Sequence, residues 1–195
     1  MMKTKIFYVA IFIFVVCNSI TAQNFDFRNT KWGMDSTQVK KSEMSKLVFA
    51  KKNTIVYNGK LGEFDSRIVY NLNSSNKLYR ASYIITLMGT MGSKNPVYYV
   101  SNFLMLQDLL TQKYKAPYSK TNSTINGKEI KQEEWAANLI SDNLTLETKW
   151  KTNRTDIILT LYSINDELCI EIIYSSLENG INDDQVNKAE ILKVL

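Results

Sequence analysis

The chain has 195 residues, a length that suits one domain with a sizeable core, and its formal net charge is +5. It contains no histidine, which excludes Ser-His-Asp catalysis, Cys-His catalysis and histidine-bearing zinc sites. The basic clusters are no longer than the pairs Lys40-Lys41 and Lys51-Lys52, so the composition predicts no nucleic-acid partner.

The N-terminal segment has the features of an export leader. Lys3 and Lys5 precede an unbroken apolar run over 6–16, and Ala22 offers a small residue at a cleavage point. The run is shorter than the about 20 apolar residues that a membrane-spanning helix needs. We therefore expect residues 1–22 to be a signal peptide that is cleaved after Ala22, which predicts a periplasmic or secreted bacterial protein.

Cleavage at this point would change both the charge and the cysteine content. The two leader lysines would be lost, so 22 basic residues would face 19 acidic residues, a net charge of +3. The mature chain, 23–195, would keep only Cys169, so no intramolecular disulfide is expected. Lipidation of Cys17 is the alternative and would anchor the protein to a membrane. Val16, directly before that cysteine, fits a lipoprotein signal poorly.

The first part of the mature chain predicts one helix and three strands. Asp35 and Gln38 have the spacing of a capping box, which predicts a helix over 36–47. Strand-like runs follow at 54–58, 64–72 and 78–87. The pair Asn58-Gly59 predicts a turn at the end of the first run.

The second part begins with a connector, 88–94, and a longer helix. Asn95 is its expected cap, Pro96 occupies its first turn, and Pro117 ends it. Apolar residues at helical spacing predict its buried face: Tyr99, Phe103, Leu106, Leu110 and Tyr114. Four strands are then expected, at 128–136, 143–150, 156–162 and 168–176. A short C-terminal helix would carry Val186, Ala189 and Leu192.

This order of elements predicts the fold class. Runs of antiparallel strands after each helix indicate an α+β fold, a two-layer sandwich in which helices pack on an antiparallel β-sheet. The ranges 30–88 and 95–176 share the same order. We therefore expect a single domain over 23–195, with two α-β-β-β half-repeats in tandem as its suggested organisation.

The segment 27–39 carries a resemblance to known proteins. Its Trp32-Gly33-Met34 run, followed by a helix cap and Val39, resembles the start of many exported bacterial proteins of uncharacterised function. A looser version opens the helix in the small lipoproteins of the outer-membrane β-barrel assembly machinery. The tandem α-β-β-β order is similar to that of β-lactamase inhibitor protein. These resemblances imply an exported protein-binding module. No site residue carries over, because nothing aligns beyond the helix start.

Few residues remain as candidates for chemistry. Paired carboxylates could hydrolyse glycosides. The pairs are Glu63 with Asp65, Glu133 with Glu134, and Asp183 with Asp184. Each pair is also explained as a solvated face or a helix cap. A carboxylate-based hydrolase therefore ranks third, behind the two binding functions given below. Cys169 lies among apolar residues and is expected to be a buried structural thiol. No phosphate loop or EF-hand spacing occurs, so no catalytic, cofactor or metal residue is assigned and no cofactor is expected.

Aromatic residues are the remaining candidates for recognition. Tyr98 is adjacent to Tyr99 on a helix, so it is expected on the exposed side. Trp32 and Trp135 are the other candidates, with core packing as their alternative role, and Trp135 is expected with Trp150 in the second group of strands. We therefore expect a non-enzymatic envelope protein that binds another protein through these three aromatic residues. A glycan- or lipid-binding domain is the alternative.

Overall fold

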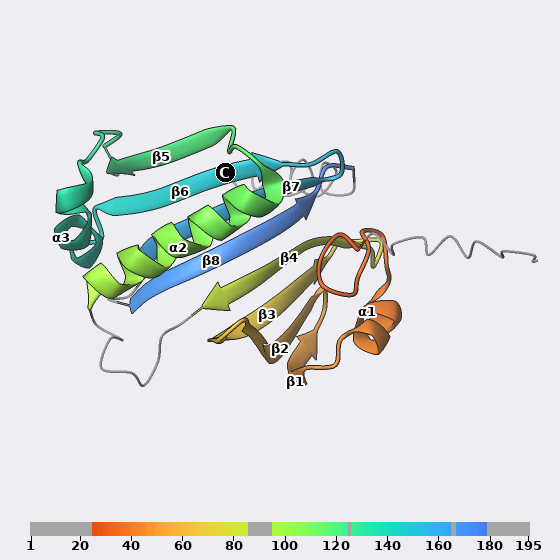
Figure 1. Ribbon diagram of the computed structural model, residues 1–195. Coiled ribbons are helices and arrows are strands. Elements are labelled where there is room, and N and C mark those ends of the chain that lie inside the picture. The colour runs from red at the N-terminus through yellow and green to blue at the C-terminus, as the bar shows by residue number, and fades with distance from the viewer. Residues whose placement is uncertain (1–24, 86–94, 125, 165–166, 179–195) are drawn as a thin grey trace, which may run out of the picture.

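An eight-stranded antiparallel sheet forms the framework of the protein, and its helices pack against it (Figure 1). The computed structural model describes residues 25–85, 95–124, 126–164 and 167–178. The α+β class and the antiparallel sheet expected from the sequence are confirmed. The predicted leader, connector and C-terminal helix lie outside the described residues.

Four strands from each half of the chain make the sheet. The helices are α1 (Ser36–Ser42), α2 (Pro96–Tyr114) and α3 (Trp135–Ile140), with a 3-10 turn η1 (Gln132–Glu134) before α3. The strands are β1 (Lys46–Lys51), β2 (Thr54–Leu61), β3 (Phe64–Leu72), β4 (Leu78–Ile85), β5 (Ser119–Thr124), β6 (Leu144–Lys151), β7 (Thr155–Ile164) and β8 (Glu167–Ser176). Their order is β1-β2-β3-β4-β8-β7-β6-β5, so the two halves meet where β4 pairs with β8.

The strands with one buried face lie where the sequence predicts them. In β3, for example, Ile68, Tyr70 and Leu72 are buried on one face, while Arg67 on the other face is exposed. The register pairs Tyr83 of β4 with Ile68 on one side and Ile172 on the other. One continuous apolar face therefore crosses the junction between the halves.

The first helix is shorter than predicted. The capping box is confirmed, since Gln38 N donates to Asp35 Oδ1 and Asp35 N donates to Gln38 Oε1, both over 2.9 Å. The prediction of a helix to residue 47 is wrong, because α1 ends at Ser42 and the following residues form β1 along β2. The carboxylate of Glu43 turns into the core, which fixes where the chain leaves the helix.

The predicted turn at Asn58-Gly59 is also wrong. Both residues lie inside β2 and pair with β3, and the turn comes later, at Gly62, whose φ is +58°. Gly59 serves a close approach instead. A Cβ at this position would lie 2.4 Å from Ile68 Cδ1 and 2.9 Å from Ser45 Oγ.

The segment before β6 differs most from the prediction. Residues 128–136 were expected to form a strand, but the strand here is β5, and 132–140 form η1 and α3. The sequence Ser119–Thr124 is entirely polar, so it lacks the alternation that reveals a half-buried strand. Trp135 accordingly begins a helix instead of a strand.

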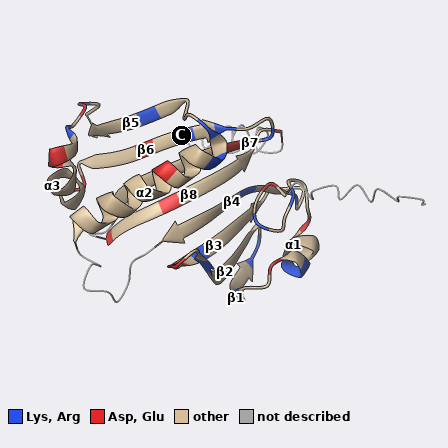
Figure 2. Ribbon diagram, viewed as in Figure 1, with Lys and Arg blue, Asp and Glu red and all other residues tan. Residues whose placement is uncertain are grey.

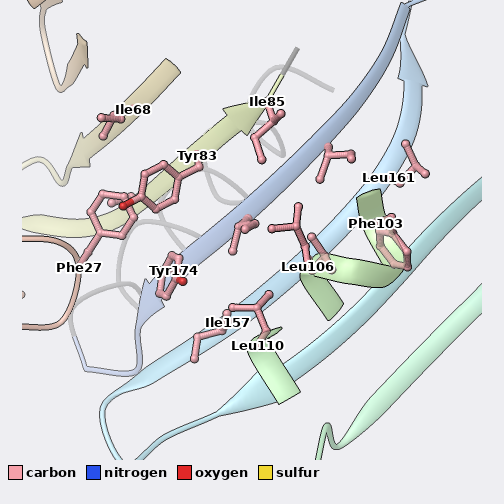
Figure 3. Close-up of a cluster of buried hydrophobic side chains, with 14 of the residues drawn as sticks. Phe27, Ile68, Tyr83, Ile85, Phe103, Leu106, Leu110, Ile157, Leu161 and Tyr174 are labelled. Carbon is pink, nitrogen blue, oxygen red and sulfur yellow. The ribbon is translucent and has the colours of Figure 1, made fainter. Parts of the chain in front are cut away.

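Helix α2 covers the second half of the sheet and contacts β6, β7 and β8. Its cap and proline lie as predicted, and Asn95 Oδ1 accepts from Val97 N over 3.0 Å. Phe103, Leu106 and Leu110 point from it into the core, where Leu161 and Ile157 of β7 lie (Figure 3). Acidic and basic residues are interspersed along both halves of the ribbon (Figure 2).

Candidate functional site

A groove runs between α2 and the first half of the chain. It has two adjoining parts, which share Leu61, Lys113 and Tyr174 in their walls. The apolar compartment, about 700 Å³, lies between α2 and the β2–β3 hairpin. The polar compartment, about 530 Å³, lies between the C-terminal end of α2 and the segment 25–28.

The apolar compartment is built on a second stripe of α2. Tyr98, Met105 and Leu109 lie beside the buried stripe and are 42%, 43% and 52% exposed. They sit at spacings of seven and four, so they share one helical face. Leu61 and Phe64 of the hairpin line the compartment from the first half of the sheet. Large apolar side chains thus meet solvent in a concave site that both halves build.

The basic residues of the groove gather in the polar compartment. Arg28, Lys113 and Arg154 line it together with one carboxylate, that of Asp26. Arg154 Nη2 lies 3.2 Å from Asp26 Oδ2, so these two charges compensate each other. Lys113 forms no ion pair with any residue that the structure describes, and its Nζ lies 5.0 Å from the centre of the Tyr114 ring.

Three tyrosines bring hydroxyl groups to the same compartment. Tyr83 and Tyr174 are almost buried, and Tyr114 is partly buried beside Tyr174, with ring centres 6.4 Å apart. Burial raises the pKa of Tyr174 well above its usual value, and the neighbouring Tyr114 raises it further. Burial also raises the pKa of Tyr83, although Arg28 opposes this shift. These two hydroxyls are neutral at neutral pH, and both have partners: Arg28 Nη1 donates to Tyr83 Oη over 3.4 Å, and Tyr174 hydrogen-bonds with Tyr114.

A tight turn positions the segment 25–28 against the sheet. Thr30 N donates to Phe27 O over 2.8 Å, and Arg28 takes a φ of +49° at the turn. The Phe27 ring lies 4.9 Å from that of Tyr83 and 5.2 Å from that of Tyr174, centre to centre (Figure 3). The turn thus lies over the junction of β4 and β8.

A buried ion pair fixes the other side of this turn. Arg28 Nε lies 2.8 Å from Glu43 Oε2, and Arg28 Nη2 donates to Glu43 Oε1 over 3.2 Å. Tyr70 Oη donates to Glu43 Oε2 over 2.6 Å, and Ser45 N donates to Oε1 over 2.9 Å. Burial alone would raise the pKa of Glu43, but these hydrogen bonds and the Arg28 charge outweigh it and lower that pKa.

Of the three aromatic residues predicted to contact a partner, only Tyr98 lines the groove. Trp32 is buried as part of the core, and its Nε1 donates to Thr155 Oγ1 over 2.9 Å. Gly33 beside it has a φ of +85°, a conformation that glycine adopts without the steric cost of a side chain. Trp135 is partly buried on α3 and donates to Ile130 O over 3.0 Å. The structure does not bring the three together.

One predicted carboxylate pair lies in the groove. Glu63 and Asp65 are exposed on the hairpin and line the apolar compartment, and Lys60 Nζ lies 3.5 Å from Asp65 Oδ1. Glu133 and Glu134 are exposed on η1, and the pair at 183–184 lies outside the described residues. In the part of the chain that the structure describes, no three His, Cys, Asp or Glu side chains come together as a metal site would require.

The buried thiol predicted at Cys169 is confirmed. Burial raises the pKa of this thiol to about 11, with Glu171 and Glu167 adding to the shift and Tyr162 opposing it. A thiol that stays protonated at neutral pH is a poor nucleophile.

Sequence reasoning missed most of the groove. The stripe of Tyr98, Met105 and Leu109 could have been found, since its spacing repeats that of the buried stripe one position away. The cation of Lys113 and the hairpin residue Leu61 carried no comparable signal, because only the tertiary structure brings them together.

Comparison of the chain with protein-family models, with curated proteins and with solved structures finds no match. Among the helices described, none combines the length and apolar character needed to cross a membrane.

Proposed function

We propose that this protein is a non-enzymatic binding protein of the bacterial envelope and that the groove along α2 is its binding site. The observation that carries the proposal is the exposed stripe of Tyr98, Met105 and Leu109 over the apolar compartment. A ligand that removes these apolar side chains from water lowers the free energy, so exposed apolar residues in a concave site favour binding.

The dimensions of the groove favour a ligand of modest size. Each compartment falls within the about 300–1,000 Å³ that is usual for small-molecule sites. Of the alternatives weighed from the sequence, a lipid fits the apolar compartment better than a glycan, because most of the residues that line it are apolar or aromatic. Export to the envelope is supported by the leader-like segment 1–22.

Replacing Leu109 by glutamine is expected to weaken binding of N-phenyl-1-naphthylamine about fivefold to tenfold, because part of the apolar wall is lost. This neutral probe fluoresces more strongly in apolar surroundings, so a titration of purified 23–195 measures its affinity. Val97→Gln is the matched control, since Val97 is 58% exposed on the same helix but does not line either compartment. Equal affinities of both variants and the unmodified protein would contradict the proposal.

A second candidate function is supported by strand β1, one of the two edge strands of the sheet. All six of its residues are exposed, and among them Leu47, Val48 and Phe49 are large and apolar. The other edge strand, β5, is polar throughout. An apolar edge with unpaired backbone groups can pair with an extended segment of another protein. This observation favours the protein-binding role expected from the sequence.

A photo-crosslinking amino acid placed at Val48 is expected to capture a protein partner in living cells, whereas one at Lys120 in β5 should capture none. Both positions lie on edge strands and are exposed, so the comparison isolates the apolar character of β1. The measurement is a gel of the purified tagged protein after irradiation. The same product from both positions, or no product from either, would argue against β1 as the interface.

A further inference from the structure

We propose that the ligand of the groove is a single-chain amphiphile with an anionic head, whose chain lies along α2 and whose head faces Lys113. This inference rests on the proposed function, because it names the class of ligand that the same groove would take. The position of Lys113 carries it, because this lysine lines both compartments and forms no ion pair with any residue that the structure describes.

The head is placed by the charges of the polar compartment. Arg154 is compensated by Asp26 and Arg28 by Glu43, which leaves the Lys113 ammonium without an acidic partner among the described residues. Tyr83, Tyr114 and Tyr174 line the same compartment. An ammonium without an acidic partner forms charge-assisted hydrogen bonds with an anion.

The chain is placed by the position of Lys113 between the compartments. Lys113 lines both of them, so a head held there leaves the attached chain next to Leu109 and Leu110 of the same helix. Ile172 of β8 lines the same compartment, as does Leu61 from the hairpin. These walls offer an apolar chain contact on both sides.

The opposite orientation is disfavoured by the acidic residues of the hairpin. Glu63 and Asp65 line the apolar compartment, whereas neither lines the polar compartment. An anionic head would be repelled by them and attracted by Lys113. An uncharged ligand would have no such preference between the two orientations. The charge of the head is therefore what should distinguish one ligand from another.

The test compares two ligands that differ only in the head. Dodecanoate and dodecan-1-ol are each used to displace N-phenyl-1-naphthylamine from the unmodified protein, from Lys113→Gln and from Lys120→Gln. Lys120 is an exposed lysine of β5 that does not line the groove, so its replacement removes the same charge elsewhere. Acetate is included as the head without a chain.

Dodecanoate is expected to bind the unmodified protein about tenfold more tightly than dodecan-1-ol, an advantage that Lys113→Gln removes and Lys120→Gln leaves intact. Acetate should displace nothing at the same concentrations. Raising the salt concentration should weaken the binding of dodecanoate alone.

Equal affinity for dodecanoate and dodecan-1-ol, or equal losses in the two lysine variants, would overturn this inference. The proposed function would still stand in that case, provided that the probe binds and Leu109→Gln weakens it. Failure of the probe itself to bind would instead overturn the proposed function. The two failures therefore have different signatures.

Discussion

Replacing Phe27 by alanine is expected to lower the free energy of unfolding by about 3–5 kcal/mol, the usual cost of deleting a buried aromatic ring. Phe27 is 3% exposed and contacts the rings of Tyr70, Tyr83 and Tyr174, which lie on β3, β4 and β8. It therefore packs across the place where the two halves of the sheet join. The substitution would leave a cavity between the turn at 27–30 and this junction.

Urea unfolding followed by tryptophan fluorescence measures this loss. Phe25→Ala is the matched control, because Phe25 lies two residues away and is 37% exposed. The control should change the free energy of unfolding by less than about 1 kcal/mol. Equal effects of the two substitutions would mean that the segment 25–30 does not pack on the sheet as the structure has it.

The predictable parts of the fold are those where burial imposes a period. The alternation in β3 and the stripe of α2 arise because one face of each meets the core, and both were predicted with nearly correct bounds. The strands β1 and β5 form the edges of the sheet. One is exposed throughout and the other is polar, so neither shows an alternation. An alternating sequence pattern records which residues are buried. The edge strands bury least, so their sequences carry the weakest pattern.

Local signals failed where a tertiary contact decides the structure. Gly59 reads as part of a turn, but it is required by the close approach of Ile68. The groove has the same cause, since its walls come from Leu61 and from α2, which lie far apart in the sequence. Tyr98 could be predicted because its exposure follows from its own helix. Lys113 could not be predicted, because its place in the groove depends on residues that only the tertiary structure brings near it.

A neutral residue in place of Glu43 is expected to cost about 3 kcal/mol of unfolding free energy at pH 7. The side chain of Glu43 is 2% exposed, and it accepts hydrogen bonds from Tyr70 and Ser45 beside the Arg28 guanidinium. In Glu43→Gln the carboxamide would present N–H groups to these donors, and Arg28 would lose its counterion. The side chain of Arg28 is 24% exposed, so water can solvate its charge in the variant. The expected cost in unfolding free energy is therefore at the lower end of the range for broken buried ion pairs.

The pH dependence separates this charge from simple packing. The pKa of Glu43 is lowered in the folded protein, so the stability it contributes is complete above its unfolded pKa of about 4.3 and is lost as the pH falls through the lower folded value. The difference in unfolding free energy between the unmodified protein and Glu43→Gln should therefore shrink between pH 6 and pH 3, as urea titrations at each pH would measure. Asp65→Asn is the control, because Asp65 pairs with Lys60 at an exposed site and its loss should cost under about 1 kcal/mol. A difference in unfolding free energy that stays constant with pH would mean that Glu43 stabilises the protein through packing and not through its charge. A shrinking one would identify the ionised Glu43 carboxylate, with its partners Tyr70, Ser45 and Arg28, as the group that holds this part of the chain on the sheet.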